Sequence, residues 1–428
     1  MKRLLILASK LGYQTRSFAE AARALGLDVV FATDRCHQLE DPWSDGAIAV
    51  QFEHPQSAAE RIVEAARERP ITGLIALGDR PTVTAAYVAK SLGLRYNAPE
   101  SVENCRSKLR QREILSAAGL LIPRFFAFQS SEPLDDVLPR VEFPCVVKPL
   151  RLAASQGVIR ANNAAEFCAA VQRIQNLIAS PEIQVAREGE LSTLLVENYI
   201  PGAEVAVEGL LDRGRLRALA IFDKPDPLEG PFFEETIYVT PSRLSTNSQR
   251  QVEDCAAAAI RALGLEHGPV HAEFRVNKSG VWVLEAAPRP IGGLCSRALR
   301  FGPRRIPLEE LLVRHAMNLQ GCELEREPQA SGVMMIPVPQ SGMLEHVEGI
   351  EAASATPGIV EIFITARLHD FIAAWPEGSS YLGFIFSRAA TPAEAEAALR
   401  EAHGRLRFTI VAGLPVEHPV TRRISNSA

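Results

Sequence analysis

Hydrophobic and polar positions in the first hundred residues follow two alternating patterns. Short apolar runs, which are typical of buried strands, are separated by segments in which apolar residues recur at helical spacing. Ser17 with Glu20, and Ser57 with Glu60, precede two of those segments and predict capping boxes at helix starts. This order of elements predicts a parallel sheet with helices on its faces. The predicted strands are Leu4–Ala8, Leu27–Ala32, Ile48–Phe52 and Ile71–Leu77.

The pattern changes near Asn104, where a basic helix is predicted to run to Gly119. Short strands follow, and the proline-rich segment Phe222–Ser242 is interpreted as a long ordered loop. A helix is predicted over Gln249–Leu263. The predicted strands of this region are Cys145–Lys148, Val158–Arg160, Leu194–Asn198, Val205–Leu210, Pro269–Val276 and Val281–Ala286.

The last hundred residues read as a separate small α+β unit, with a helix that begins at a Thr391–Glu394 capping box. The predicted fold class is therefore multidomain, α/β and α+β. We expect an N-terminal α/β domain at 1–103, a central domain at 104–320 and the C-terminal α+β unit at 321–428. The predicted strands of the last unit are Val333–Pro337, Leu382–Ser387 and Phe408–Val411.

Composition narrows the possible functions. The 428 residues are 47% hydrophobic and 23% charged, and the net charge is −5. A chain of this length and balance is typical of a multidomain globular protein. The mixed charges argue against nucleic-acid binding, and the short apolar runs argue against a membrane helix. The apolar stretch Leu4–Ala8 is too short for a secretory signal, and seven scattered cysteines without a Cys-x-x-Cys pair indicate a cytoplasmic location.

Two acidic residues on neighbouring predicted strands are the most informative pair in the chain. A hairpin loop at 278–280 sets Glu273 opposite Glu285, with their Cβ atoms roughly 4.5–5.5 Å apart. Two such carboxylates repel unless a cation lies between them, and Mg²⁺ carried by a nucleotide favours such ligands. If the loop differs by one residue, Glu273 faces Leu284 and the two acids are ordinary surface residues.

A lysine at a strand end gives a second candidate for anion binding. Lys148 ends the apolar strand Cys145–Lys148 and precedes a loop of small residues around Ser155 and Gly157. A lysine so placed can hold a phosphate, with loop amides as further donors, although reaching solvent is the more common outcome. Lys108, taken alone, is an ordinary basic residue on the face of a basic helix.

These features occur in an order that resembles the ATP-grasp superfamily. The matching pieces are Lys108-Leu-Arg-Gln-Arg-Glu-Ile-Leu-Ser-Ala-Ala-Gly119, Val146-Val-Lys148-Pro, Leu195-Val-Glu197-Asn-Tyr-Ile-Pro-Gly202-Ala-Glu204-Val, His271-Ala-Glu273 and Glu285-Ala-Ala-Pro-Arg289-Pro. The resemblance runs from about residue 100 to 320 and implies a central ATP-grasp fold, in which two α+β subdomains clasp the nucleotide. The flanking regions look like the preceding α/β domain and the small C-terminal domain of carboxylate–amine ligases.

The resemblance implies roles for individual residues. Lys108 and Lys148 match the lysines that contact ATP phosphates, with Ser155 and Gly157 in the loop that covers them. The hinge beside adenine corresponds to Glu197, Asn198, Tyr199 and Ile200, and the ribose-binding acid corresponds to Glu204. Glu273 and Glu285 match the ligands of Mg²⁺ or Mn²⁺, and Arg289 matches the catalytic arginine that binds phosphoryl and carboxylate oxygens. His271 lies on the same strand face as Glu273 and is kept as a catalytic base or a hydrogen-bonding partner.

Two positions depart from the family pattern. Ala287 stands where many members have an asparagine after the second metal ligand, although some formate-dependent purine ligases also lack it. The phosphate-covering loop is also poor in glycine, with Gly157 alone among residues 151–158. From Ala287 we expect one metal ion to be held more loosely, and from the scarcity of glycine we expect a loop that closes less readily.

The resemblance implies an ADP-forming carboxylate–amine ligase that works through an acyl phosphate and uses a small-molecule carboxylate and an amine as substrates. Arg289 and the amides of residues 291–293 are expected at the oxyanion, and the Phe232–Glu235 segment is a candidate for substrate contacts. A formate- or bicarbonate-using ligase of the purine or biotin-carboxylase type remains an alternative, as does a non-catalytic ATP-binding sensor. A homodimer also stays open, because the sequence carries no signal for oligomeric state.

Overall fold

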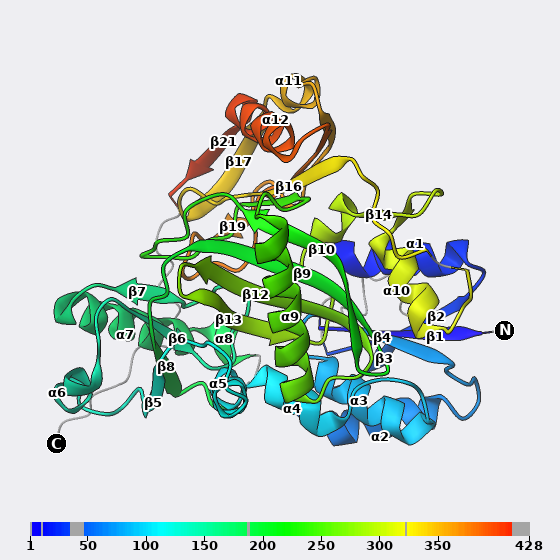
Figure 1. Ribbon diagram of the computed structural model, residues 1–428, viewed down its shortest axis with the longest axis horizontal. Coiled ribbons are helices and arrows are strands. Elements are labelled where there is room, and N and C mark those ends of the chain that lie inside the picture. Colours follow the sequence, from blue (N-terminus) through cyan, green and yellow to red (C-terminus); the bar gives the residue numbers. More distant parts are fainter. Residues whose placement is uncertain (1, 10–11, 35–46, 186–188, 322, 413–428) are drawn as a thin grey trace, which may run out of the picture.

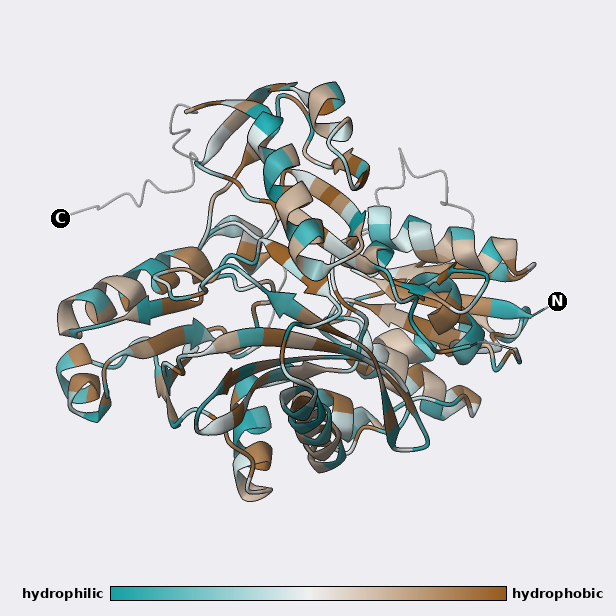
Figure 2. Ribbon diagram, turned by 45° about the horizontal axis from the view of Figure 1, so that its top comes forward, coloured by the Kyte–Doolittle hydropathy of each residue, from teal (hydrophilic) through white to brown (hydrophobic). Residues whose placement is uncertain are grey.

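The computed structural model describes residues 2–9, 12–34, 47–185, 189–321 and 323–412. Within these residues, the N-terminal domain lies at one end of the molecule and the strands β5 to β8 (within 125–198) lie at the other, with the long strands β9, β10, β12 and β13 (within 203–224 and 268–287) between them (Figure 1). Hydrophobic and hydrophilic residues alternate along many strands, and the helices carry both kinds (Figure 2). No helix in the described ranges is long and apolar enough to cross a membrane.

The N-terminal domain is the predicted parallel sheet, with strand order β3-β2-β1-β4. Side chains of β1 alternate between its two faces: Leu4 and Ile6 pack toward α1, while Leu5 and Leu7 pack toward α2 and α3. The sheet is therefore covered on both sides, as a parallel sheet requires. The elements are β1 (Arg3–Ala8), α1 (Tyr13–Ala24), β2 (Asp28–Thr33), β3 (Ala47–Ala49), α2 (Pro55–Ala65), β4 (Gly73–Leu77) and α3 (Thr82–Leu92).

The two capping boxes predicted in this domain are wrong. Helix α1 begins one turn earlier, after Gly12, and the Ser17 hydroxyl lies inside the helix, where it donates to the Tyr13 carbonyl at 3.2 Å. Helix α2 begins with Pro55 at its first turn, so Ser57 is also inside. The predicted Thr391–Glu394 box is confirmed and caps α12 (Pro392–Arg405).

Two helices stand where one was predicted between the N-terminal and central regions. Helix α4 (Pro99–Arg106) ends at Ser107, whose hydroxyl accepts a hydrogen bond from the Arg110 amide and caps α5 (Lys108–Ala117). The chain leaves α5 through Gly119, which has a φ of +73°. The break between the two helices at Ser107 places Lys108 at the first position of α5.

A four-stranded sheet with order β5-β8-β6-β7 forms one wall of the central region. Neither its edge strand β5 nor its covering helix α7 was predicted, and α7 is capped by the Asn163 side chain, which accepts from the Glu166 amide at 3.0 Å. The elements are β5 (Phe125–Gln129), α6 (Leu134–Val137), η2 (Leu138–Arg140), β6 (Cys145–Pro149), β7 (Ile159–Ala161), α7 (Ala164–Ile178), α8 (Pro181–Gln184) and β8 (Thr193–Asn198).

An eight-stranded sheet forms the other wall, with order β13-β12-β9-β10-β11-β16-β20-β18. Part of the segment predicted as the loop Phe222–Ser242 belongs to it, because β10 runs to Lys224 and β11 begins at Ile237. The elements that build this wall from the central region are β9 (Ala203–Asp212), β10 (Arg215–Lys224), β11 (Ile237–Thr240), α9 (Thr246–Leu263), β12 (Gly268–Asn277) and β13 (Gly280–Ala287).

The C-terminal residues do not form a fully separate unit, because β16 pairs with β11 and extends the large sheet. A second, three-stranded sheet with order β19-β17-β21 completes this end of the molecule. The remaining elements are η3 (Cys295–Ala298), β14 (Arg300–Phe301), β15 (Ile306–Pro307), α10 (Leu308–Ala316), β16 (Ala330–Ile336), β17 (Gly342–Glu348), α11 (Ile350–Ser354), β18 (Ile359–Ile364), β19 (Phe371–Ile372), β20 (Gly383–Ala389) and β21 (Arg407–Val411).

Candidate active site

A cavity of about 790 Å³ lies between the four-stranded sheet, the large sheet and the ends of β1 and β4. The structure brings nearly all of the predicted site residues to this one cavity, although they come from three regions of the chain. Gly157 is the exception, since its neighbours Gln156 and Val158 line the cavity and it does not. The predicted residues that line it are Lys108, Lys148, Ser155, Glu197, Asn198, Tyr199, Ile200, Glu204, His271, Glu273, Glu285 and Arg289.

Glu273 and Glu285 face each other across the β12–β13 hairpin, but not through the predicted loop. The loop has two residues rather than three, so Asn277 pairs with Gly280, and Phe274 pairs with Val283. A β-bulge between Glu273 and Phe274 leaves Leu284 without a partner residue and restores the Glu273–Glu285 pair. The bulge therefore turns both carboxylates toward the cavity.

The pair fits a divalent cation. Oε1 of Glu273 accepts from Lys224 at 3.0 Å and lies 3.3 Å from Nε2 of His271. Within the described residues, no hydrogen bond or ion pair engages the Glu285 carboxylate, although Glu285 lines the cavity. Carboxylate oxygens that face a polar cavity without a protein partner are the donors that Mg²⁺ takes, together with phosphate oxygens and water.

Lys224 is a buried cation that sequence reasoning missed. It ends β10, is 7% exposed, and its ammonium pairs with Glu204 at 2.9 Å, with Glu273 at 3.0 Å and with Glu235. Burial alone disfavours the ammonium, but the three carboxylates raise the pKa of Lys224 well above its ordinary value. Lys224 therefore stays charged and neutralises the acidic floor of the cavity.

Two acids near Lys224 have contacts that differ from those expected. The Glu204 carboxylate, which was matched to ribose binding, pairs with both Lys224 and Arg275, each at 2.9 Å. Glu235, considered as a partner for a substrate ammonium, binds Lys224 and accepts from the Tyr238 hydroxyl at 2.7 Å. Both carboxylates are thus already committed within the protein.

His271 is held between two carboxylates. Its Nδ1 lies 3.1 Å from Oε2 of Glu208, and its Nε2 lies 3.3 Å from Oε1 of Glu273. Burial disfavours the imidazolium, yet the hydrogen bonds to Glu208 and Glu273 outweigh it and raise the pKa of His271 to about 9. Because carboxylates engage both ring nitrogens, the arrangement favours the hydrogen-bonding alternative, in which His271 positions Glu273.

Lys148 belongs to a buried ionic group that joins three elements. Glu197, 4% exposed on β8, binds Arg112 of α5 and Lys148 of β6, each at 2.6 Å. Arg112 also donates to the Leu284 carbonyl at the β-bulge, at 2.5 Å. Burial raises the pKa of Glu197, but the charges of Arg112 and Lys148 outweigh it and lower that pKa below its ordinary value. The group fixes the Lys148 side chain beside the cavity.

The hinge residues 197–200 line the cavity, but two of their backbone amides already donate hydrogen bonds within the protein. The Glu197 side chain holds Lys148, so only its backbone remains for a nucleotide base. The amides of Asn198 and Tyr199 donate to the Arg124 and Pro144 carbonyls, each at 3.0 Å. The Tyr199 ring lies under the Arg160 guanidinium, 4.0 Å from its centroid.

The loop at residues 151–158 is held in place by contacts from both sides. Lys108 donates to the Leu152 carbonyl at 2.6 Å. From the C-terminal region, the Trp375 indole donates to the Ala154 carbonyl at 3.1 Å, and the Gly157 amide donates to the Pro376 carbonyl at 3.0 Å. Ala154 and Ser155 both have a φ of +54°, a region that usually favours glycine. These contacts explain how a loop with few glycines keeps its shape.

Arg289 is oriented by the N-terminal domain. Its Nε donates to the Asp79 carboxylate, just beyond the end of β4, at 2.7 Å. Burial disfavours ionised Asp79, but the charge and hydrogen bond of Arg289 outweigh it and lower the pKa of Asp79. Of the amides proposed for an oxyanion, that of Ile291 donates to Glu208 at 3.2 Å, which leaves those of Gly292 and Gly293.

Other candidates for substrate contacts divide into two groups. Phe233 lines the cavity and stacks on Tyr199, with ring centroids 6.5 Å apart. Phe232 packs instead against the core of the four-stranded sheet. The Glu234 carboxylate accepts a hydrogen bond from the Val338 amide at 3.3 Å. Arg297 and Arg300, considered as an extended anion subsite, bind Glu361 and backbone carbonyls respectively.

Family models match most of the chain. The ATP-grasp N-terminal domain matches residues 19–94, the ATP-grasp domain matches 141–298, and the L-amino acid ligase C-terminal domain 2 matches 334–411. These ranges contain the predicted site residues except Lys108.

Individual proteins show the same relationship. The chain is 24% identical over 427 residues to the uncharacterized protein y4rH of Sinorhizobium fredii, covering 96% of this chain and 84% of that protein. It is 25% identical over 268 residues to alanine–anticapsin ligase of Bacillus amyloliquefaciens, and this match spans 56% of each protein, or about half the length of that relative.

A solved structure matches almost the whole chain. The L-amino acid ligase from Bacillus licheniformis superposes with a TM-score of 0.81 at 27% identity, covering 96% of this chain and 99% of that one. The matching models and this structural likeness lead to one conclusion. The chain belongs to the ATP-grasp superfamily, among the ADP-forming carboxylate–amine ligases that resemble L-amino acid ligases.

Proposed function

We propose that this protein joins the carboxylate of an amino acid to an amine, with ATP converted to ADP and phosphate. The observation that carries the proposal is the convergence of Glu273, Glu285, Lys148 and Arg289 on one cavity of about 790 Å³. That volume lies within the range of small-molecule sites. Anionic and cationic groups facing one space suit the transfer of a phosphoryl group, in which the protein chiefly positions the reactants and neutralises charge.

In the first step, a carboxylate oxygen of the substrate attacks the γ-phosphorus of ATP, and the bond to the β-phosphate oxygen breaks. ADP leaves with the electron pair. We assign Lys148 to the phosphates, because Glu197 and Arg112 fix its position without consuming all of its hydrogen-bond donors. Lys108 is assigned to the loop that covers the phosphates, since its ammonium binds the Leu152 carbonyl.

Glu273 and Glu285 would hold Mg²⁺ or Mn²⁺, which supplies charge neutralisation between phosphate oxygens when bound. Lys224 and His271 then orient Glu273 through Oε1, so that its second oxygen faces the cavity. Glu285, which faces Glu273 across the β12–β13 pair, would supply a second carboxylate ligand. Ala287 leaves the neighbouring position without an oxygen donor.

In the second step, the amine nitrogen attacks the acyl carbon, a tetrahedral oxyanion forms, and phosphate leaves with the electron pair of the carbon–oxygen bond. The proton that the amine nitrogen loses is taken up by the leaving phosphate, which departs as hydrogen phosphate. We assign the oxyanion to the Arg289 guanidinium, oriented by Asp79, and to the amides of Gly292 and Gly293. Beyond Arg289 the cavity is lined by Tyr13, Met335 and Tyr381, which can contact an apolar substrate side chain.

Phosphate release tests this proposal. Purified protein is incubated with ATP, Mg²⁺ and pools of amino acids, and products are identified by mass spectrometry. Release that requires particular acid–amine pairs, with a product heavier by the joined amine minus water, is the expected result. Tight ATP binding without release under any pool would indicate a nucleotide sensor, and release with formate or bicarbonate alone would indicate the alternative ligase type. Because ATP is an intracellular substrate, the proposal also places the reaction in the cytoplasm.

A further inference from the structure

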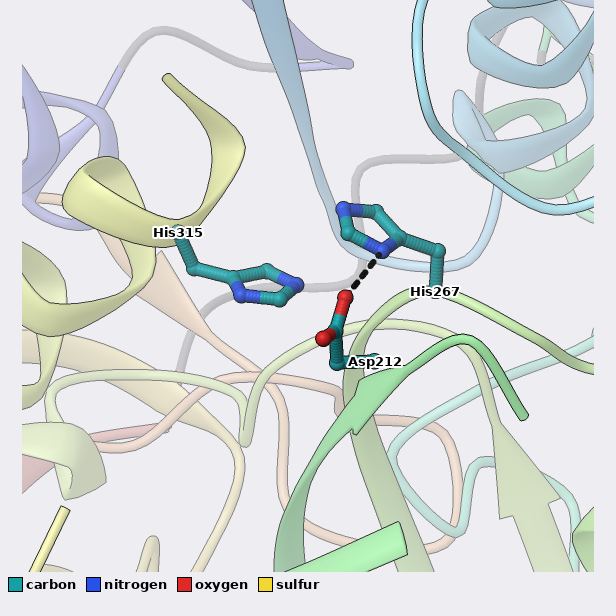
Figure 3. A group of neighbouring side chains, drawn as sticks. All are labelled: Asp212, His267 and His315. Carbon is teal, nitrogen blue, oxygen red and sulfur yellow. Dashed lines mark ion pairs between the residues drawn. The ribbon is translucent and has the colours of Figure 1, made fainter. Parts of the chain in front are cut away.

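Three potential metal ligands meet at the end of the large sheet that lies away from the catalytic cavity. Asp212 is the last residue of β9, His267 directly precedes β12, and His315 lies in the last turn of α10 (Figure 3). His267 is six residues before Glu273, which corresponds to about 20 Å along an extended strand. None of the three residues lines the cavity of about 790 Å³.

The three side chains converge on one point. One possible ligand atom from each lies within 4.8 Å of the others, and Nδ1 of His267 is 3.6 Å from Oδ1 of Asp212. The far nitrogen of the His315 ring points toward the Asp212 carboxylate in Figure 3. Tetrahedral zinc, with bonds of about 2.0–2.1 Å, needs ligand atoms about 3.3 Å apart. The His267–Asp212 spacing is already close to this value, so the side chains have to move inward by at most about 1 Å.

The His315 ring carries an unsatisfied polar atom at this point. Its Nε2 is buried and has no hydrogen-bond partner in the described part of the chain. A buried nitrogen without a partner costs free energy, and a metal ion would remove that cost.

The backbone around His267 is held by a side chain from the preceding region. Oδ1 of Asn97 accepts from the amides of Glu266 and His267 at 2.7 and 2.9 Å, and its Nδ2 donates to the His267 carbonyl at 2.9 Å. His267 is 6% exposed, whereas the Asp212 side chain is 57% exposed. The site is thus rigid on its inner side and open to solvent at Asp212, where a water can supply a fourth ligand.

We propose that Asp212, His267 and His315 bind a divalent transition-metal ion, zinc above all, and that the ion fastens α10 to the end of the large sheet. Two imidazoles and a carboxylate form a borderline donor set that suits zinc and disfavours magnesium. Helix α10 also packs against α1 and β4 of the N-terminal domain, so the ion would tie that domain to the central one. The proposal is independent of the ligase activity.

The competing interpretation is a stacked histidine pair capped by an aspartate without metal. The two rings are stacked, with centroids 4.3 Å apart and planes at 23°, and Arg95 lies 3.8 Å from Asp212. An exposed pair such as Arg95–Asp212 is weak, so it does not prevent Asp212 from binding a metal. Under the metal-site interpretation the purified protein binds one zinc ion at these residues, whereas under the stacked-pair interpretation it binds none there.

Zinc binding to the full chain, with any histidine tag removed, tests the proposal. Protein stripped of transition metals is titrated with Zn²⁺ by calorimetry, in millimolar Mg²⁺ that is added to occupy the catalytic carboxylates. In a parallel sample, Co²⁺ is added and its visible spectrum is recorded. We expect one zinc per chain, a higher thermal midpoint with zinc, and cobalt bands of a tetrahedral site. Asp212→Asn and His315→Gln should each weaken zinc binding by more than about ten-fold.

Matched variants make the result specific. Asp254→Asn and His346→Gln remove an exposed aspartate and an exposed histidine elsewhere, and both should bind zinc as the wild type does. Asp212→Asn changes a largely exposed side chain, so its metal-free form should unfold at the wild-type temperature. The proposal is overturned if the wild type binds no stoichiometric zinc, or if Asp212→Asn and His315→Gln bind it as tightly as the wild type.

Discussion

The Glu197→Gln substitution removes the negative charge that faces two buried cations. Glu197 binds Arg112 and Lys148 at 2.6 Å each, and the Glu197 and Arg112 side chains are only 5% and 2% exposed. Glutamine has nearly the same shape as glutamate, so the packing of α5, β6 and β8 is retained. The variant therefore isolates the effect of the charge.

The expected loss of stability follows from this geometry. Removing one partner of a buried ion pair typically costs about 3–5 kcal/mol, because the remaining charge is left without compensation. Glutamine keeps one acceptor oxygen for a cation, so we expect the lower figure, about 3 kcal/mol. That value corresponds to a change of roughly 100-fold in the folding equilibrium.

Urea unfolding measures this loss, and each unfolding transition of the multidomain chain is fitted separately. Glu142→Gln is the control. Glu142 also binds an arginine, Arg124, at 2.9 Å, but both side chains are more than half exposed. We expect no measurable change in the control, because exposed ion pairs contribute little. Removing Arg112 as well relieves repulsion, so Arg112→Gln/Glu197→Gln should be more stable than the sum of the single effects predicts.

The pH dependence supplies a second check. The pKa of Glu197 is lower in the folded protein than its ordinary value, so its charge stabilises the fold above about pH 4.3 and that stabilisation is lost as the pH falls through the lowered pKa. The difference between wild type and Glu197→Gln should therefore shrink in acid. A loss below about 1 kcal/mol at neutral pH, with additive double-variant effects, would refute the reasoning.

Three further outcomes follow from the site. Lys148→Ala should weaken ATP binding much more than adenosine binding, measured by calorimetry, and equal losses would place the lysine away from the phosphates. Lys224→Met should lower the unfolding free energy by about 3–5 kcal/mol, because it leaves three carboxylates facing one another, and a thermal midpoint equal to that of the wild type would contradict this. Arg289→Lys should reduce kcat far more than it changes the KM for ATP, because lysine lacks the planar fork, and unchanged kcat would exclude Arg289 from the oxyanion.

The sequence predicted the facing of Glu273 and Glu285, but for an incomplete reason. Period-two alternation placed both acids on one face, whereas the loop length was wrong by one residue. The bulge at Leu284 shifts the register by one residue and so restores the predicted Glu273–Glu285 pair. Arg112 of α5 donates a hydrogen bond to the Leu284 carbonyl. A bulge that depends on such a tertiary contact leaves no local signal in the hairpin sequence.

Long-range charge pairing explains most of what the sequence did not reveal. Lys224 lies in a segment rich in proline, which was interpreted as a loop, and its three acidic partners come from β9, from β12 and from the segment before β11. The resemblance matched Glu197 to the hinge through its backbone and gave its side chain no role, since the partner of that side chain, Arg112, lies 85 residues away. The signal that could have found Lys224 is a lysine at the end of the apolar run 218–222.

Helix starts show the same limit at the local level. The sequences around Ser17 and Ser57 satisfy the capping-box pattern, yet Gly12 and Pro55 begin those helices earlier, where the chain leaves the preceding strand or turn. The Thr391–Glu394 box succeeded because Pro392 follows it at the first helical position and reinforces the same start. A pattern with two agreeing signals was therefore the safer prediction.

Titration calorimetry of ATP, with and without Mg²⁺, on the wild type and on Glu285→Gln tests the central claim most directly. If Glu273 and Glu285 jointly bind the cation that accompanies the nucleotide, Mg²⁺ should tighten ATP binding to the wild type and have little effect on the variant, which should unfold at or above the wild-type temperature because one repulsive charge is gone. Equal strengthening of ATP binding by Mg²⁺ in both proteins would contradict the assignment of these two carboxylates.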